Sequence, residues 1–117
     1  MMSHVTIWHN PRCSKSRAAL ALLEEQGIDA EVFKYLDENP TSEEIKALLA
    51  KLHLSARDLM RTKEALYKEL GLKEVTEEEK LIEAMAAHPK LIERPVVVTG
   101  EKAVIGRPTE KILELFS

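Results

Sequence analysis

Several things are missing or scarce in this sequence. Among 117 residues there is one cysteine, Cys13, so no intrachain disulfide can form. No apolar run approaches the roughly 18 residues that cross a bilayer, and residues 1–9 lack the basic and apolar regions of a secretory signal. The net charge is −3, so no excess of positive charge draws the chain to nucleic acid or to an anionic membrane. We therefore expect a cytoplasmic protein with no nucleic-acid partner and no membrane partner.

The composition is that of a folded domain. Hydrophobic residues make up 44% of the chain and charged residues 32%, which is too apolar for intrinsic disorder. A chain of this length supplies one hydrophobic core of useful size but not two. We therefore expect residues 1–117 to form a single domain.

The first third of the chain predicts a β-α-β unit. A short β-type run at 4–9 ends at the turn signal Asn10-Pro11. Apolar residues at helical spacing predict a helix at about 14–26, and a second β-type run lies at about 30–35. A strand, a helix and a strand in close succession favour a parallel pair with a right-handed crossover.

The middle of the chain is predicted to be helical. Thr41 and Glu44 have the spacing of a capping box, and apolar residues then follow one face of a helix at 42–52. Ser55 and Thr76 mark the starts of two further helices. Glutamates in these first turns are expected to be solvated and to favour the helix dipole.

The last part predicts a hairpin and a helix. Two β-branched runs, 95–98 and 103–105, flank a turn-like segment with a glycine, and Pro108 precedes a last amphipathic helix. The predicted fold class is therefore α/β, with a mixed sheet and the order βαβ, helical insertion, ββα. The insertion is expected at about 36–93.

Cys13 stands at the junction between the first strand and the first helix. The free N–H groups and the dipole at a helix N-terminus favour an anion, and Arg12, Lys15 and Arg17 add positive charge nearby. Both influences lower the pKa of a thiol. Cys13 is therefore interpreted as a reactive thiolate, and the alternative is a small buried core residue.

Three other kinds of cysteine site are excluded by counting. A dithiol redox pair needs a cysteine at position 16, where the chain has Ser16. A phosphatase loop with an arginine six residues after the cysteine would need it at position 19, where the chain has Ala19. No metal site is predicted, because zinc needs clustered ligands and the histidines are scattered: they are His4, His9, His53 and His88.

His9 and Ser16 are the candidates for assisting Cys13. The ring of His9, four residues before the cysteine, could exchange a proton with the thiol near neutral pH. The hydroxyl of Ser16, three residues after it, would share a helical face with the thiolate and hydrogen-bond to it. The alternatives are a histidine at the end of a strand and an ordinary residue of a first helical turn.

Three arginines are candidates for binding an oxyanion: Arg61, Arg94 and Arg107. Planar guanidinium groups bind tetrahedral oxyanions through paired hydrogen bonds. Arg94 and Arg107 each precede a proline, which restricts their backbone to extended conformations and makes the first pair a candidate for a cis peptide. The alternative is that each arginine is a surface residue.

Taken together, these motifs resemble the arsenate reductase family that is coupled to glutathione and glutaredoxin. The resemblance runs essentially end to end. Its motifs are His9-Asn10-Pro11 with Cys13 and Ser16, then Arg61, Tyr67 with Leu70-Gly71-Leu72, His88-Pro89 with Leu91-Ile92, Arg94-Pro95-Val96-Val97-Val98, and Arg107-Pro108.

The resemblance implies a thioredoxin-like fold and an enzyme that reduces arsenate to arsenite, with arsenate or a similar oxyanion as its binding partner. Cys13 would be its nucleophile, and the three candidate arginines would bind the oxyanion. No cofactor would be bound; glutathione would be a co-substrate, and glutaredoxin would reduce the resulting Cys13–glutathione disulfide. Two alternatives remain. One is a related thiol reductase with a different substrate, and the other is a redox-responsive regulator that binds a protein such as RNA polymerase.

Overall fold

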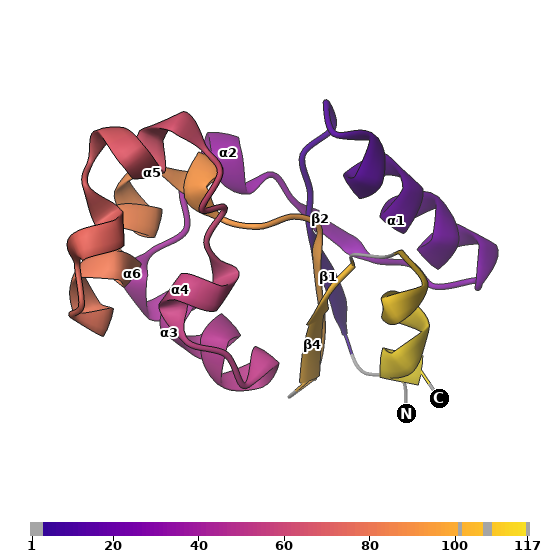
Figure 1. Ribbon diagram of the computed structural model, residues 1–117. Helices are drawn as coiled ribbons and strands as arrows, with labels where there is room; N and C mark the ends of the chain where they lie inside the picture. The colour runs from indigo at the N-terminus through magenta and orange to yellow at the C-terminus, as the bar shows by residue number, and fades with distance from the viewer. Residues whose placement is uncertain (1–3, 101, 107–108, 117) are drawn as a thin grey trace. The chain divides into compact units, whose positions relative to one another are not determined.

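The structure is a computed structural model that describes residues 4–100, 102–106 and 109–116. The chain divides into two compact units. One contains the residues up to Glu38 and those from Arg94 on, and the other is Asn39–Glu93. In Figure 1 the first unit holds all the strands, and the second is helical.

The first unit is a four-stranded mixed sheet with helices. The strand order is β2-β1-β3-β4; β1 pairs in parallel with β2 and antiparallel with β3, and β3 and β4 form an antiparallel hairpin. The helices α1 and η3 lie on one face of this sheet in Figure 1. In chain order the elements are β1 (Val5–Trp8), α1 (Ser14–Glu25), β2 (Glu31–Phe33), α2 (Tyr35–Glu38), β3 (Val96–Thr99), β4 (Lys102–Ile105) and the 3-10 helix η3 (Thr109–Phe116).

The core of this unit lies between the sheet and its helices. Apolar side chains of β1, β3, α1 and η3 are removed from water together, which is the main force holding the unit. They are Val5, Ile7, Ala19, Leu23, Val97 and Ile112. The packing fixes the end of β1 against the start of α1, and Cys13 lies at that junction.

The second unit consists of short helices. Its elements are α3 (Ser42–Leu52), α4 (Ala56–Leu59), α5 (Ala65–Glu69), the 3-10 helix η1 (Leu72–Glu74), α6 (Glu78–Ala87) and the 3-10 helix η2 (Pro89–Leu91). The predicted capping box is present: the Glu44 N–H donates to Thr41 Oγ1 at 3.1 Å, and the Thr41 N–H donates to Glu44 Oε1 at 3.0 Å. These bonds satisfy two otherwise unpaired N–H groups at the start of α3.

Arg57 has a structural role that no motif in the sequence indicates. Its guanidinium donates hydrogen bonds to the Tyr67 hydroxyl and to the backbone carbonyls of Leu72 and Val75. One side chain therefore fixes α5, η1 and the residue after η1, a region with little periodic signal of its own. The contacts link residues 10 to 18 positions apart in sequence.

The predicted class, mixed sheet and element order are confirmed, with local differences. The second strand stops at Phe33 because Tyr35 begins α2 and is buried, with its ring 6.1 Å from that of Trp8. The helix predicted to begin at Thr76 has Glu77 as its N-cap instead. Pro108 lies outside the described residues, and the helix that follows is a 3-10 helix. The single domain of residues 1–117, with an insertion at about 36–93, stays a prediction beside the observed unit Asn39–Glu93.

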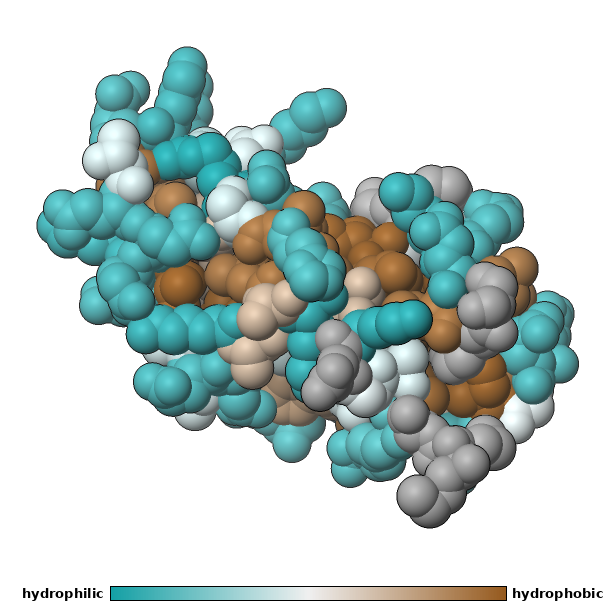
Figure 2. All heavy atoms as spheres, turned by 90° about the horizontal axis from the view of Figure 1, so that it is seen from below, coloured by the Kyte–Doolittle hydropathy of each residue, from teal (hydrophilic) through white to brown (hydrophobic). Residues whose placement is uncertain are grey.

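On the face drawn in Figure 2, most of the side chains that project furthest are hydrophilic, and hydrophobic residues show between them. Among the described residues, no helix is both long enough and apolar enough to cross a membrane.

Candidate functional site

The loop between β1 and α1 holds Cys13 at the N-cap of the helix. Asn10 organises this loop: its Oδ1 accepts the N–H of Arg12 at 3.0 Å, and its carbonyl oxygen accepts the N–H of Cys13 at 3.0 Å. Arg17 reaches back from α1 and donates to the carbonyl of Pro11 at 3.0 Å. These bonds give Cys13 an extended backbone (φ −94°, ψ 124°) and leave the first N–H groups of α1 around its side chain.

The pKa of Cys13 is lowered from its ordinary value of 9.0. Burial opposes this change, since the residue is only 8% exposed and a charged form is disfavoured there. The backbone N–H groups of Ser16 and Lys15 favour the thiolate, as does the Arg94 side chain through a hydrogen bond and its charge, and together they outweigh burial. Sγ of Cys13 does not accept a capping hydrogen bond of standard geometry from the first turn of α1. The helix start therefore acts mainly by stabilising negative charge on the sulfur.

Arg94 comes from the segment that leads into β3. The Arg94–Pro95 peptide is cis, and the Nε and Nη1 atoms of Arg94 are buried. The Gly106 N–H donates to the carbonyl of Pro95 at 2.8 Å, which joins this segment to the end of β4. Two residues predicted for the site, Cys13 and Arg94, are thus brought together although they are 81 positions apart.

His9 and Ser16 form a buried pair at the base of the Cys13 loop. His9 Nδ1 lies 2.6 Å from Ser16 Oγ, and the same oxygen accepts the N–H of Asn10 at 3.0 Å. The spacing of Ser16 from Cys13 predicts a hydrogen bond between the Ser16 hydroxyl and the thiolate. Among the described residues the hydroxyl instead contacts His9 and Asn10, and Ser16 favours the thiolate through its backbone N–H.

The pKa of His9 is lowered from its ordinary value of 6.5. Burial is the first cause, and the positive charges of Lys34 and Arg17 add to it. His9 is therefore neutral at neutral pH. In the neutral form protonated at Nε2, Nδ1 accepts the hydroxyl proton of Ser16.

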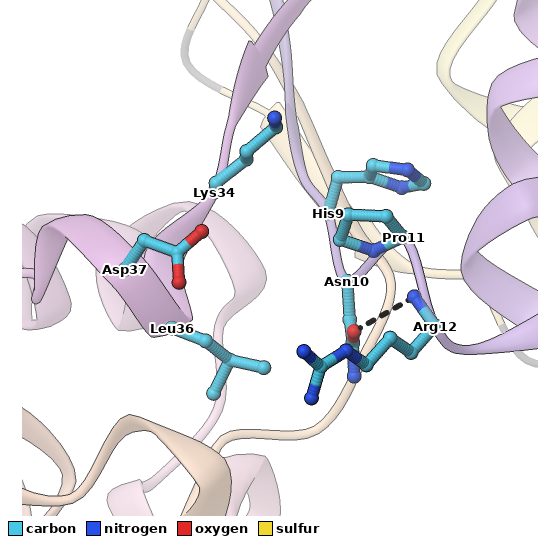
Figure 3. Close-up of a pocket in the computed structure, with 7 residues that line it drawn as sticks. All are labelled: His9, Asn10, Pro11, Arg12, Lys34, Leu36 and Asp37. Carbon is cyan, nitrogen blue, oxygen red and sulfur yellow. Dashed lines mark hydrogen bonds between the residues drawn. The ribbon is translucent and has the colours of Figure 1, made fainter.

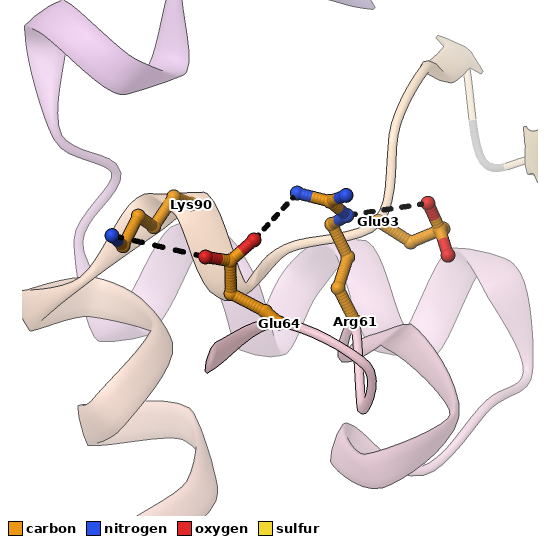
Figure 4. Close-up of polar contacts among 4 residues, drawn as sticks. All are labelled: Arg61, Glu64, Lys90 and Glu93. Carbon is orange, nitrogen blue, oxygen red and sulfur yellow. Dashed lines mark hydrogen bonds and ion pairs between the residues drawn. The ribbon is translucent and has the colours of Figure 1, made fainter. Parts of the chain in front are cut away.

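Arg61 lies in the second unit, within a group of charged side chains drawn in Figure 4. Its Nη1 is 3.0 Å from Glu64 Oε2, and its Nε is 4.0 Å from Glu93 Oε1. Lys90 pairs with the other oxygen of Glu64 at 3.8 Å. Two carboxylates thus offset the charge of Arg61, and its part in binding an oxyanion stays a prediction. Arg107, the third candidate arginine, lies outside the described residues.

A pocket of about 260 Å³ opens beside the Cys13 loop (Figure 3). The loop contributes one wall, and the end of β2 with the start of α2 contributes the other. The lining residues are His9, Asn10, Pro11, Arg12, Lys34, Leu36 and Asp37. Sequence reasoning missed the second wall, because Lys34, Leu36 and Asp37 form no motif and meet the loop only through the pairing of β1 with β2.

Comparisons with known proteins cover nearly the whole chain. The ArsC family model matches residues 8–115. An arsenate reductase of Neisseria meningitidis serogroup A is 56% identical over 113 residues, which cover 95% of this chain and 97% of the relative. An arsenate reductase of Escherichia coli is 40% identical over 116 residues, covering 98% of this chain and 82% of the relative.

A solved structure of an arsenate reductase from Vibrio cholerae has the same fold. Its TM-score to this structure is 0.94 at 52% identity, and the match covers 97% of this chain and 98% of that one. The family model and these relatives each extend over nearly the whole chain. The chain therefore belongs to the ArsC family.

Proposed function

We propose that this protein is an oxidoreductase that reduces arsenate to arsenite, with Cys13 as its nucleophile. Support for the substrate comes from relatives named arsenate reductase that are 56% and 40% identical to this chain. Support for the nucleophile comes above all from the position of the chain's only thiol at the N-cap of α1, where the helix N-terminus and Arg94 lower its pKa. A thiolate beside a guanidinium is suited to attack an anionic oxyanion, because the cation offsets their repulsion.

The chemistry requires two thiols. Attack of the Cys13 thiolate on arsenate forms a sulfur–arsenic bond and breaks one arsenic–oxygen bond, and the departing oxygen takes up protons from solvent and leaves as water. A second thiolate then attacks the Cys13 sulfur, so a disulfide forms, the sulfur–arsenic bond breaks, and its electron pair remains on arsenic. Pentavalent arsenic thereby becomes trivalent arsenite.

The second thiol must come from outside the chain, because Cys13 has no partner cysteine. We assign it to glutathione as a co-substrate, with no bound cofactor. Glutaredoxin would then reduce the Cys13–glutathione disulfide by thiol–disulfide exchange. This scheme suits the cytoplasm, where a glutathione pool keeps thiols reduced.

The same scheme assigns roles to the remaining candidate residues of the site. Arg94 would hold the oxyanion at Cys13, and Arg61 and Arg107 would complete the set of guanidinium groups. For Arg61, arsenate would compete with Glu64 and Glu93. His9 and Ser16 would fix the Cys13 loop, and the neutral ring of His9 could take up a proton during the reaction.

The test is an arsenate reduction assay with purified protein, glutathione and glutaredoxin, together with mass spectrometry of the trapped enzyme. The unsubstituted protein should form arsenite and accumulate a Cys13–glutathione disulfide when glutaredoxin is omitted. Cys13→Ser should abolish both, while Ser14→Ala, an exposed neighbour in α1, should leave both intact. Arsenite formation by Cys13→Ser at the unsubstituted rate would refute the proposal. No turnover together with stoichiometric capture of RNA polymerase would favour a regulator instead.

A further inference from the structure

The pocket beside the Cys13 loop carries charges of both signs. Arg12 and Lys34 are cationic, Asp37 is anionic, and all three side chains are exposed. In Figure 3, Arg12 and Leu36 reach toward one another from opposite walls, and the Asp37 carboxylate faces the loop that carries Asn10. None of these three charged side chains forms an ion pair with another residue in the part of the chain that the structure describes.

The two walls are held in place by backbone hydrogen bonds. The His9 N–H donates to the Phe33 carbonyl at 2.9 Å, which ties the start of the loop to the end of β2. The N–H groups of Asp37 and Glu38 both donate to the Lys34 carbonyl, at 2.9 and 3.0 Å. Backbone hydrogen bonds therefore join the two walls of the pocket and fix the segments from which its charged side chains extend.

This set of groups does not suit a simple oxyanion. A carboxylate in the wall repels an arsenate or phosphate ion, whereas two cations and one carboxylate complement a ligand with two negative groups and one positive group. Glutathione has that pattern: its γ-glutamyl end carries an ammonium and a carboxylate, and its glycine end carries a second carboxylate. The half-exposed Leu36 side chain would contact the methylene groups of the γ-glutamyl chain.

We propose that this pocket (Figure 3) binds glutathione, with Asp37 accepting hydrogen bonds from the γ-glutamyl ammonium and with Lys34 and Arg12 each facing one of its two carboxylates. The inference rests on the proposed function, in which glutathione supplies the second thiol. Arg12 and Cys13 are adjacent, so their Cα atoms are about 3.8 Å apart, and an extended tripeptide spans about 10 Å. A tripeptide anchored beside Arg12 is thus long enough to reach the backbone of Cys13, which lies next to the residues that line the pocket.

The experiment measures binding directly. S-methylglutathione has no free thiol, so its affinity can be measured by NMR titration without arsenate and without turnover. Its N-acetyl derivative lacks the ammonium. The unsubstituted protein should bind S-methylglutathione about two- to fivefold more tightly than the N-acetyl derivative, the range expected for one exposed charge pair.

Two variants and a control locate the contact. Asp37→Asn should bind the two ligands with equal affinity, because it no longer recognises the ammonium. Arg12→Gln should weaken both ligands by a similar factor and keep the preference between them. Asp29→Asn removes a carboxylate from the exposed loop before β2, outside the pocket, and should behave as the unsubstituted protein.

Three outcomes would overturn the inference. One is that S-methylglutathione does not bind, and another is that Asp37→Asn keeps the full preference for the ammonium. The third is that Asp37→Asn strengthens arsenate binding in this pocket, which would make it an oxyanion site. Because the titration contains no arsenate turnover, its result is separate from the Cys13→Ser assay, and either proposal can fail alone.

Discussion

His9 Nδ1 lies 2.6 Å from Ser16 Oγ, and both side chains are buried beneath the loop that carries Cys13. The Ser16 oxygen also accepts the Asn10 N–H, so it joins β1, the loop and α1. A hydroxyl with this many buried partners is hard to replace, because water cannot reach the groups it would leave behind.

Ser16→Ala should therefore lower the free energy of unfolding by about 1–3 kcal/mol, the usual cost of leaving buried polar groups without a partner. Urea unfolding followed by circular dichroism measures this change. Ser14→Ala is the matched control in the same turn of α1, where the side chain is exposed. It should change stability by less than about 0.5 kcal/mol. Equal effects of the two substitutions would show that the buried contacts contribute nothing.

The titration of His9 gives a second prediction. Its pKa is lowered by burial first and by Lys34 and Arg17 next, so Lys34→Gln should raise this pKa but not restore it fully. An NMR titration of the ring protons measures the change. Lys51→Gln, which removes a charge from the other unit, should leave the value unchanged.

The same titration predicts how stability depends on pH. A histidine whose pKa is lowered in the folded state binds fewer protons there than in the unfolded chain. The contribution of neutral His9 to the free energy of unfolding is therefore fully present above pH 6.5, and it is lost as the pH falls through the pKa of His9 in the folded protein. Urea unfolding between pH 7 and the acid limit should show this loss, and His9→Gln should reduce the slope. A slope unchanged by His9→Gln would contradict the assignment.

The third prediction concerns the thiol. Arg94 favours the Cys13 thiolate through a hydrogen bond and its charge, so Arg94→Gln should raise the pKa of Cys13. The backbone N–H groups of Ser16 and Lys15 remain, so part of the lowering should persist. The pH dependence of the iodoacetamide alkylation rate measures the pKa. Lys111→Gln, an exposed charge change in η3, is the control and should leave the profile unchanged.

How far the site could be predicted depended on distance along the chain. The Cys13 loop could be predicted because the strand end, the turn residues and the helix start are consecutive, and the helix start alone implies thiolate stabilisation. Arg94 could be named as a candidate from its Arg-Pro pair, but its place beside Cys13 could not be predicted, since only the pairing of β3 with β1 brings it there. Lys34 and Asp37 could not be predicted as part of a pocket, because strand pairing places them opposite Arg12.

The fold, too, could be predicted only where its signals come from residues close together in sequence. Periodicity and a capping box predicted α3 with its observed bounds, since both signals are local. In contrast, α5 and η1 depend on hydrogen bonds from Arg57, which comes from α4. A single arginine in a short helix gives no sign in the sequence that it will bind two distant carbonyls.

The last prediction tests the close packing behind the Arg94–Pro95 segment. Gly106 has little room for a side chain: a Cβ there would lie 3.0 Å from Ile112 Cδ1 and 3.1 Å from Pro95 Cγ. Gly106→Ala therefore requires these two packed side chains to shift by a few tenths of an ångström, which should cost about 1–3 kcal/mol of unfolding free energy.

A double substitution distinguishes this clash from a backbone effect. Ile112→Val removes the Cδ1 atom and by itself should cost about 0.5–1.5 kcal/mol, because it leaves a small cavity in the core. In the Gly106→Ala/Ile112→Val protein the new methyl group enters that space, so the total loss should be smaller than the sum of the two single losses. Urea unfolding of the four proteins measures this coupling. Additive losses would mean that the space beside Ile112 Cδ1 does not limit the side chain at position 106.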